Sequence, residues 1–181
     1  MIYGSRGPGG ETKALEYFTR AADAGDSFAK YLAGECYYHG KGTPANVEKA
    51  VEYLQQARAL NEPHAMDLLG AYYRNTRQFD QALQSFKEAV TLGYTNSLAN
   101  LGVMYMNGEG VAANPVVAAN LFKQSAEKGN PSGMFYYAVT LWDGTGVRKD
   151  RKAATDWFKR TAQAGDRRAI AWCNQNKVPF K

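Results

Sequence analysis

The fold is decided by a unit that is clearest in residues 97–133, which read SLANLGVMYMNGEGVAANPVVAANLFKQSAEKGNPSG. Its second half contains the segment 118–122, AANLF, and closes at Gly129. Four further segments align with AANLF, and they lie at residues 14–18, 50–54, 82–86 and 154–158. They are followed by Gly25, Asn61, Gly93 and Gly165, which gives spacings of 36, 32, 36 and 36 residues along the chain. A period of this size is typical of a repeat protein.

Each unit reads as two helices. In the last full unit, Ala154, Trp157, Phe158, Thr161 and Ala162 form one apolar stripe at the helical period. The Gly or Asn that closes the unit tolerates the left-handed backbone that follows a helix end. The pattern predicts helices over residues 12–24, 27–39, 47–60, 63–74, 79–92, 95–107, 115–128, 131–142, 150–164 and 167–175.

A single hairpin cannot bury both of its faces, so neighbouring hairpins must stack. The prediction is an all-α, right-handed α-solenoid of helix-turn-helix repeats, with about four full units and partial units at both ends. A column of small residues, from Ala50 to Ala154, lets helices approach closely, and Leu54, Phe86 and Phe122 fill the space between them. We expect residues 1–11 to be a disordered or partial-repeat loop, 12–176 the solenoid and 177–181 a tail.

The segment 97–111, with its Gly108-Glu109-Gly110 loop, resembles the signature of the Sel-one-like repeats (SLR), relatives of the tetratricopeptide repeats. Residues 40–42 and 144–146 repeat this glycine loop, and the resemblance covers roughly residues 12 to 175. The second unit departs from it, because residues 74–79, RNTRQF, replace the glycine loop and the unit is four residues shorter. The resemblance implies a protein–protein interaction module, and the departure implies a change of local curvature.

Composition limits the classes of protein. The chain has 181 residues, 45% of them hydrophobic, which is enough for one domain with a core. Its uncharged runs are too short to span a bilayer. The net charge is +5, but residues 143–181 carry ten Lys or Arg against four Asp or Glu, and the rest of the chain sums to −1.

The amino end is read as the loop of a repeat whose first helix is missing, because Gly4 precedes Ala14 as Gly108 precedes Ala118. The sequence therefore favours a fragment of a longer protein over an unusual gene start. No signal peptide is visible. We expect a cytoplasmic location if the chain is complete, while a fragment that has lost its leader leaves a periplasmic or secreted location open.

The sequence gives little support for a catalytic site or a metal site. Cys36 and Cys173 lie about four repeats apart, too far for a disulfide, which needs Cα atoms within about 7 Å. Cys36 and His39 share a helix face, but a structural zinc site needs four ligands and no second Cys/His cluster exists. A Cys–His nucleophile would also need an orienting group and an oxyanion hole. We predict no catalytic residue, no metal and no cofactor.

The first helix of each unit lines the concave side in tetratricopeptide-like stacks, and the resemblance carries that register to this chain. The register places on this side Phe28, Tyr31, Glu35, Tyr38 and His39; His64, Asp67, Ala71, Arg74 and Asn75; Asn96, Ala99, Val103, Met106 and Asn107; and Ser132, Phe135, Val139, Trp142 and Asp143. Many of them are aromatic, as at protein interfaces. The predicted partner-binding residues are Tyr31, Tyr38, His39, Arg74, Asn75, Met106, Asn107, Phe135 and Trp142. The alternatives are that Tyr31, Tyr38 and Trp142 only fill gaps between repeats, or that the register is off by one.

A positive end is formed by residues 148–152, RKDRK, together with Lys159, Arg160, Arg167 and Arg168. An ordinary solvated surface is the favoured interpretation, followed by a site for an acidic protein, and then by nucleic acid or membrane.

The predicted function is that of a non-catalytic adaptor that grips a segment of another protein in its groove. The alternatives are an inhibitor or immunity-type binder that neutralises one enzyme or toxin and, less favoured, a hydrolytic enzyme. We expect no small-molecule substrate and no membrane span, and nucleic acid is disfavoured. An uncapped first helix leaves end-to-end self-association open.

Overall fold

The computed structural model of the chain describes residues 8–180, which form ten α-helices and no strand. The helices are α1 (Pro8–Asp23), α2 (Ser27–His39), α3 (Val47–Ala59), α4 (Pro63–Asn75), α5 (Phe79–Thr91), α6 (Ser97–Asn107), α7 (Pro115–Glu127), α8 (Pro131–Asp143), α9 (Arg151–Gln163) and α10 (Arg167–Gln175). All ten predicted helices are present. The first begins four residues early, so residues 8–11 are helical and not loop, while Gly4 lies outside the described residues.

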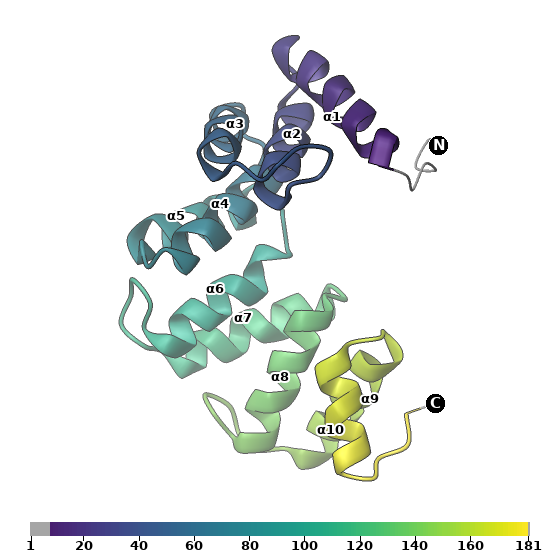
Figure 1. The fold of residues 1–181 in the computed structure, drawn as a ribbon. Helices are drawn as coiled ribbons and strands as arrows, with labels where there is room; N and C mark the ends of the chain where they lie inside the picture. Colours follow the sequence, from purple (N-terminus) through teal and green to yellow (C-terminus); the bar gives the residue numbers. More distant parts are fainter. Residues whose placement is uncertain (1–7, 181) are drawn as a thin grey trace.

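The helices form stacked hairpins, as predicted for an all-α solenoid. The pairs α2–α3, α4–α5, α6–α7 and α8–α9 are the closest packed, and each second helix also packs against the first helix of the next pair. Figure 1 shows the hairpins following one another along a curved stack, from α1 to α9 and α10. Within residues 8–180, none of the helices has the length and apolar character needed to cross a membrane.

Local sequence explains where the helices begin and end. The side chains of Asp26, Asn46, Asn114, Asn130, Asp150 and Asp166 cap helix starts by accepting hydrogen bonds from backbone amides. Each second helix is followed by a residue with positive φ, as predicted: these are Gly25, Asn61, Gly93, Gly129 and Gly165. Pro115 and Pro131 occupy first-turn positions, where no amide donor is needed.

The core of each hairpin is a large side chain seated on a small one. Leu54, Phe86, Phe122 and Phe158 are each at most 2% exposed. A Cβ built on Gly70 would lie 2.7 Å from the ring of Phe86, and one on Gly102 would lie 2.6 Å from the ring of Phe122. A side chain at either glycine would therefore collide with the ring that packs there.

The second glycine of each loop touches the hairpin before it. A Cβ on Gly42 would lie 2.4 Å from the carbonyl oxygen of Glu11 at the start of α1, and one on Gly110 would lie 2.8 Å from that of Phe79 in α5. A Cβ on Gly146 would likewise lie 2.0 Å from the carbonyl oxygen of Pro115 at the start of α7. We call these contacts glycine clamps. The shortened second repeat has a tight turn over residues 76–78 in place of the loop, so α3 has no clamp.

The chain end belongs to the core, which moves the predicted boundary at residue 176. Val178 and Phe180 pack against the apolar cluster of the last hairpin, which includes Phe158 and Cys173. The amide of Val178 also donates a hydrogen bond to the carbonyl of Cys173 at 2.9 Å.

The clamps predict a position-dependent cost of adding one methyl group. Gly146→Ala must both adopt φ near +72° and displace the carbonyl of Pro115, whereas Gly165→Ala, at φ +87°, has nothing within 4 Å. The left-handed backbone costs each alanine roughly 1–2 kcal/mol. We expect Gly146→Ala to lower the free energy of unfolding by at least ~1 kcal/mol more than Gly165→Ala, measured by urea titration. Equal costs would mean that the clamp contributes nothing.

The packed chain end predicts a second stability effect. Replacing Val178 and Phe180 together by Ala removes two half-buried side chains from the last hairpin, and we expect a loss of about 1–2 kcal/mol in the free energy of unfolding. The matched control is Pro179→Ala, since Pro179 lies between them and is exposed. If the double variant unfolds like the control, the end of the chain does not stabilise the fold.

Candidate functional site

The predicted partner-binding residues come from the first helices of the hairpins, α2, α4, α6 and α8. Among helices of like position, α2 packs against α4 and α6 against α8, and the second helices have no comparably extensive contact with one another in the described chain. A stack whose first helices approach more closely than its second helices curves toward the first. We call the side formed by α2, α4, α6 and α8 the inner surface.

A cavity of about 370 Å³ opens on the inner surface between α4, α6 and α8, and we call it the central cavity. Three of the predicted residues line it, namely Arg74, Met106 and Asn107. Its remaining lining is Val103, Phe122, Tyr136, Val139, Thr140 and Thr145. The lining is therefore mostly apolar, with a few polar side chains among it. Residues from three successive hairpins converge at this point.

An ion pair closes one edge of the central cavity. The Arg74 guanidinium donates from Nε to Oε2 of Glu109 at 2.5 Å and from Nη2 to Oε1 at 3.2 Å, and the Asn107 amide donates to Oε1 at 2.9 Å. The hydrogen bond from Arg74 is the main cause that lowers the pKa of Glu109. Sequence reasoning missed Glu109, because its position between two loop glycines gives no sign that it faces α4.

Asn75 is exposed beside this ion pair. It lines a separate shallow cavity of about 430 Å³ with Arg74, Arg77, Phe79 and Glu109. The guanidinium of Arg74 therefore stands between the two cavities, and a group bound in either one would lie close to the same charged pair.

An aromatic cluster occupies the other half of the inner surface. The His64 ring lies 5.2 Å from Phe28, 5.3 Å from Tyr31 and 4.6 Å from Tyr94, measured between ring centroids. Phe28 stays 43% exposed. Tyr94 was missed by the sequence analysis because it lies in the connection between α5 and α6, outside the helical register. The cluster offers an apolar face of the kind that protein partners contact.

Acidic side chains lie next to this cluster. Nδ1 of His64 lies 2.6 Å from Oε1 of Glu62, which caps the start of α4. Asp67 accepts hydrogen bonds from the Ser97 hydroxyl at 2.6 Å and from the Asn100 amide at 3.2 Å, and burial raises its pKa. Burial, with the nearby Glu35 charge, raises the pKa of Tyr31 to about 12, which further favours the neutral hydroxyl, a hydrogen-bond donor.

Tyr38 and His39 lie at the end of α2, away from both features. Their rings contact each other at a centroid distance of 5.0 Å; Tyr38 is half-buried and His39 is exposed. Their role in binding stays a prediction.

Phe135 and Trp142 pack toward the last hairpin. The Phe135 ring lies 5.8 Å from Phe158, and the Trp142 ring lies 5.0 Å from Trp172. Both are half-buried against the cluster that holds the last hairpin together. Gap filling, the alternative that the sequence left open for Trp142, accounts for its contact with Trp172. Partner binding by Phe135 and Trp142 stays a prediction.

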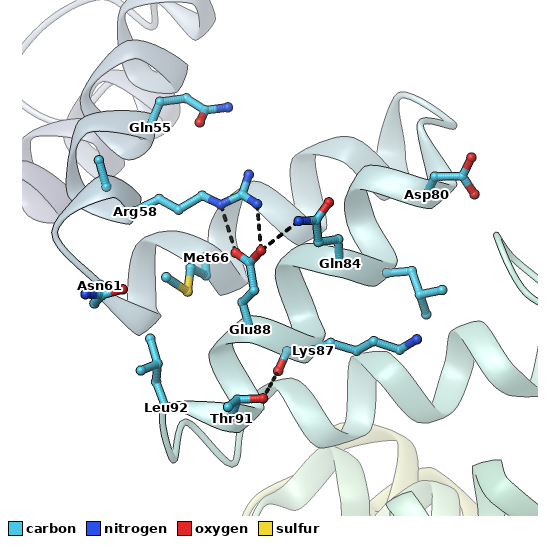
Figure 2. Close-up of a pocket in the computed structure, with 12 residues that line it drawn as sticks. Gln55, Arg58, Asn61, Met66, Asp80, Gln84, Lys87, Glu88, Thr91 and Leu92 are labelled. Atoms are coloured by element: carbon cyan, nitrogen blue, oxygen red, sulfur yellow. Dashed lines mark hydrogen bonds and ion pairs between the residues drawn. The ribbon is translucent and has the colours of Figure 1, made fainter.

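A second groove, absent from the sequence analysis, runs between α3 and α5 on the outer side. It encloses about 900 Å³. Figure 2 shows Arg58 of α3 reaching across to Glu88 of α5, with both nitrogen–oxygen distances at 2.9 Å, while Gln84 donates to the same carboxylate. Leu92 is 44% exposed at its end. The groove lies on the hairpin pair in which the glycine clamp is missing.

The cysteines provide no reactive centre in the geometry observed. Cys36 and Cys173 are both free and buried, and burial raises the pKa of both thiols. A raised pKa leaves less thiolate for nucleophilic attack. Among residues 8–180, His, Cys, Asp and Glu side chains form no group of three that could hold a metal ion.

Comparison with known proteins places the chain among repeat proteins. The Sel1 repeat model matches residues 3–26, 27–62, 95–130 and 131–166. Each complete match spans one hairpin, and the segment between them, residues 63–94, is the shortened α4–α5 unit. The crystal structure of a Sel1 repeat protein from Oxalobacter formigenes is similar, with a TM-score of 0.83, 26% identity, and coverage of 88% of this chain and 65% of that one.

Two curated relatives carry names that refer to other proteins. DAP3-binding cell death enhancer 1 of Rattus norvegicus is 28% identical over 158 residues, covering 65% of this chain and 31% of that protein. The ERAD-associated E3 ubiquitin-protein ligase component HRD3B of Arabidopsis thaliana is 31% identical over 102 residues, covering 50% of this chain and 17% of that protein. The chain thus spans at most about a third of either relative's length.

Sel1 repeat proteins are generally protein-interaction scaffolds, typically without catalytic activity. The Sel1 repeat model matches more than half of this chain, and the hairpin stack agrees with it. The chain therefore belongs to the Sel1 repeat family.

Proposed function

We propose that this chain is a non-catalytic interaction module that binds a segment of a partner protein along its inner surface, with the central cavity as the anchoring point. The convergence of Arg74, Met106 and Asn107 on one cavity is the observation that carries the proposal. Arg74 belongs to the α4–α5 hairpin, whereas Met106 and Asn107 belong to the next one, so the fold brings the two segments together.

The chemistry of the cavity suits a side chain of mixed character. Val103, Met106 and Val139 offer apolar contact, while the Arg74–Glu109 pair and the Asn107 amide offer hydrogen bonds at the edge. Small pockets with an apolar floor and a few placed polar groups are typical binding sites. An apolar side chain in the cavity and a polar neighbour at the rim would satisfy both parts.

Rigidity supports the same function. Arg74 is held by two hydrogen bonds to Glu109, and the aromatic cluster is packed through four ring contacts. A surface that is ordered before binding loses little entropy when the partner arrives. The family's usual role as a protein-interaction scaffold points in the same direction.

The proposal predicts that a charge in the central cavity abolishes tight binding. Partners are first retrieved from a lysate of the source organism and identified by mass spectrometry, and the binding segment is then produced separately for titration calorimetry. Met106→Asp places a carboxylate among the apolar side chains of the lining, and we expect at least a tenfold loss of affinity, about 1.4 kcal/mol.

The matched control is Asn120→Asp, which adds the same single negative charge to the exposed side of α7 and should leave the affinity within about twofold of the wild type. Thermal melts confirm that both variants keep the fold. A partner that binds Met106→Asp as tightly as it binds the wild type contradicts the proposal. If the same partner is instead lost with Glu88→Lys, the binding face is the outer groove. Stoichiometry and dissociation rate then separate a scaffold from a dedicated inhibitor.

A further inference from the structure

Positive charge is concentrated at one end of the molecule. Residues 143–181 carry ten Lys or Arg against four Asp or Glu, while the rest of the chain sums to −1. The structure gathers a large part of this excess on the loop between α8 and α9 and on the first turn of α9. Arg148, Lys149, Arg151 and Lys152 all lie there and are all exposed. We call these four residues, with Arg160, the basic surface.

The basic surface is hollowed. A shallow cavity of about 560 Å³ has Arg148, Lys149 and Arg151 in its wall, with Tyr137, Leu141, Val147 and Asp150 completing the lining. Three cations around one depression can reach a bound anion from several directions, which a flat array of side chains cannot do.

The charges of this surface are almost unopposed. In the described part of the chain, Arg148, Lys149, Lys152 and Arg160 form no ion pair. Asp150 keeps its negative charge among these cations, and its Oδ1 accepts the amide hydrogen of Ala153 at 2.9 Å as the cap of α9. Arg168 differs, since Asp166 pairs with it at 2.7 Å, and for this reason we leave it out of the surface.

Aromatic rings stand beside the cations. The Tyr137 and Trp157 rings meet edge to face with centroids 5.7 Å apart, and both are half-buried. The Arg160 guanidinium lies 5.2 Å from the Trp157 ring and the Arg151 guanidinium 4.9 Å from the Trp142 ring. Such contacts hold the arginines in place while their hydrogen-bond donors stay free.

We propose that the basic surface binds an acidic peptide segment of a partner protein, at a site separate from the central cavity. Carboxylates pair with guanidinium groups through two hydrogen bonds at once, and the arginines of this surface have those donors available. The surface is confined to one hairpin. Proteins that bind single-stranded nucleic acid instead use a basic groove that follows the phosphate backbone over several nucleotides. A compact site of this kind fits a short acidic stretch.

The test uses a fluorescein-labelled peptide of alternating Asp and Glu, about 12 residues long, which is enough to cross the surface in extended form. Binding is followed by fluorescence anisotropy on the full chain. We expect saturable one-to-one binding that weakens at least tenfold when salt is raised from about 0.05 M to about 0.3 M. A peptide of the same length made of Asn and Gln should not bind.

Two variants with the same change in net charge separate the site from the overall charge. Arg148→Glu/Lys149→Glu/Lys152→Glu reverses three cations of the basic surface and should weaken peptide binding at least thirtyfold, about 2 kcal/mol. Lys87→Glu/Lys123→Glu/Lys128→Glu reverses three exposed lysines of α5, α7 and the turn that follows it, and should keep most of the affinity. Met106→Asp should bind the peptide like the wild type, so failure of the central cavity does not affect this test.

Three outcomes would overturn the proposal. The first is an equal loss in the two triple variants, which would mean attraction to the net charge alone. The second is an absence of peptide binding by the wild type at low salt. The third is binding of an oligothymidylate of the same length at least tenfold tighter than the peptide, which would assign the surface to nucleic acid.

Discussion

The close approach of the two helices in each hairpin is the constraint on which the structure depends. Bare positions at Gly34, Gly70 and Gly102 let a Leu or Phe of the second helix sit directly on the backbone of the first, at distances where even one methyl group would collide. The last full hairpin has Ala138 at the corresponding position, so the requirement is for a small residue. Because this contact uses one face of each helix, the other faces pack against neighbouring hairpins or face the solvent.

Positions without a side chain also allow close contacts between hairpins. Loop glycines let one hairpin rest on the backbone of the one before it, and three of the junctions use this contact. The α4–α5 hairpin has a short turn in place of the loop, and it packs less extensively on both neighbours than α7 packs on α8. The outer groove between α3 and α5 lies at this junction (Figure 2). The groove and the shortened connection thus lie in the same part of the stack.

The sequence predicted whatever depends on local pattern. The ten helices, the Gly or Asn that follows each second helix and the buried column from Leu54 to Phe158 follow from periodicity and from a few end residues. Features that depend on how separate segments meet were not visible. Glu109 reaches Arg74 across 35 positions, Tyr94 joins a ring cluster from a connection, and Phe180 folds back onto the last hairpin. Trp142 shows the same limit, because an aromatic residue in the groove register also fits the gap beside Trp172.

The shortened repeat has a consequence for recognition. A solenoid of identical units presents the same surface again and again, so an extended partner could shift by one unit and lose few of its contacts. Here one unit differs in length, lacks a clamp and brings Arg74 against the loop of its neighbour. The inner surface therefore has one position that the other units do not repeat. A partner segment that contacts this unit would therefore have a single alignment along the stack.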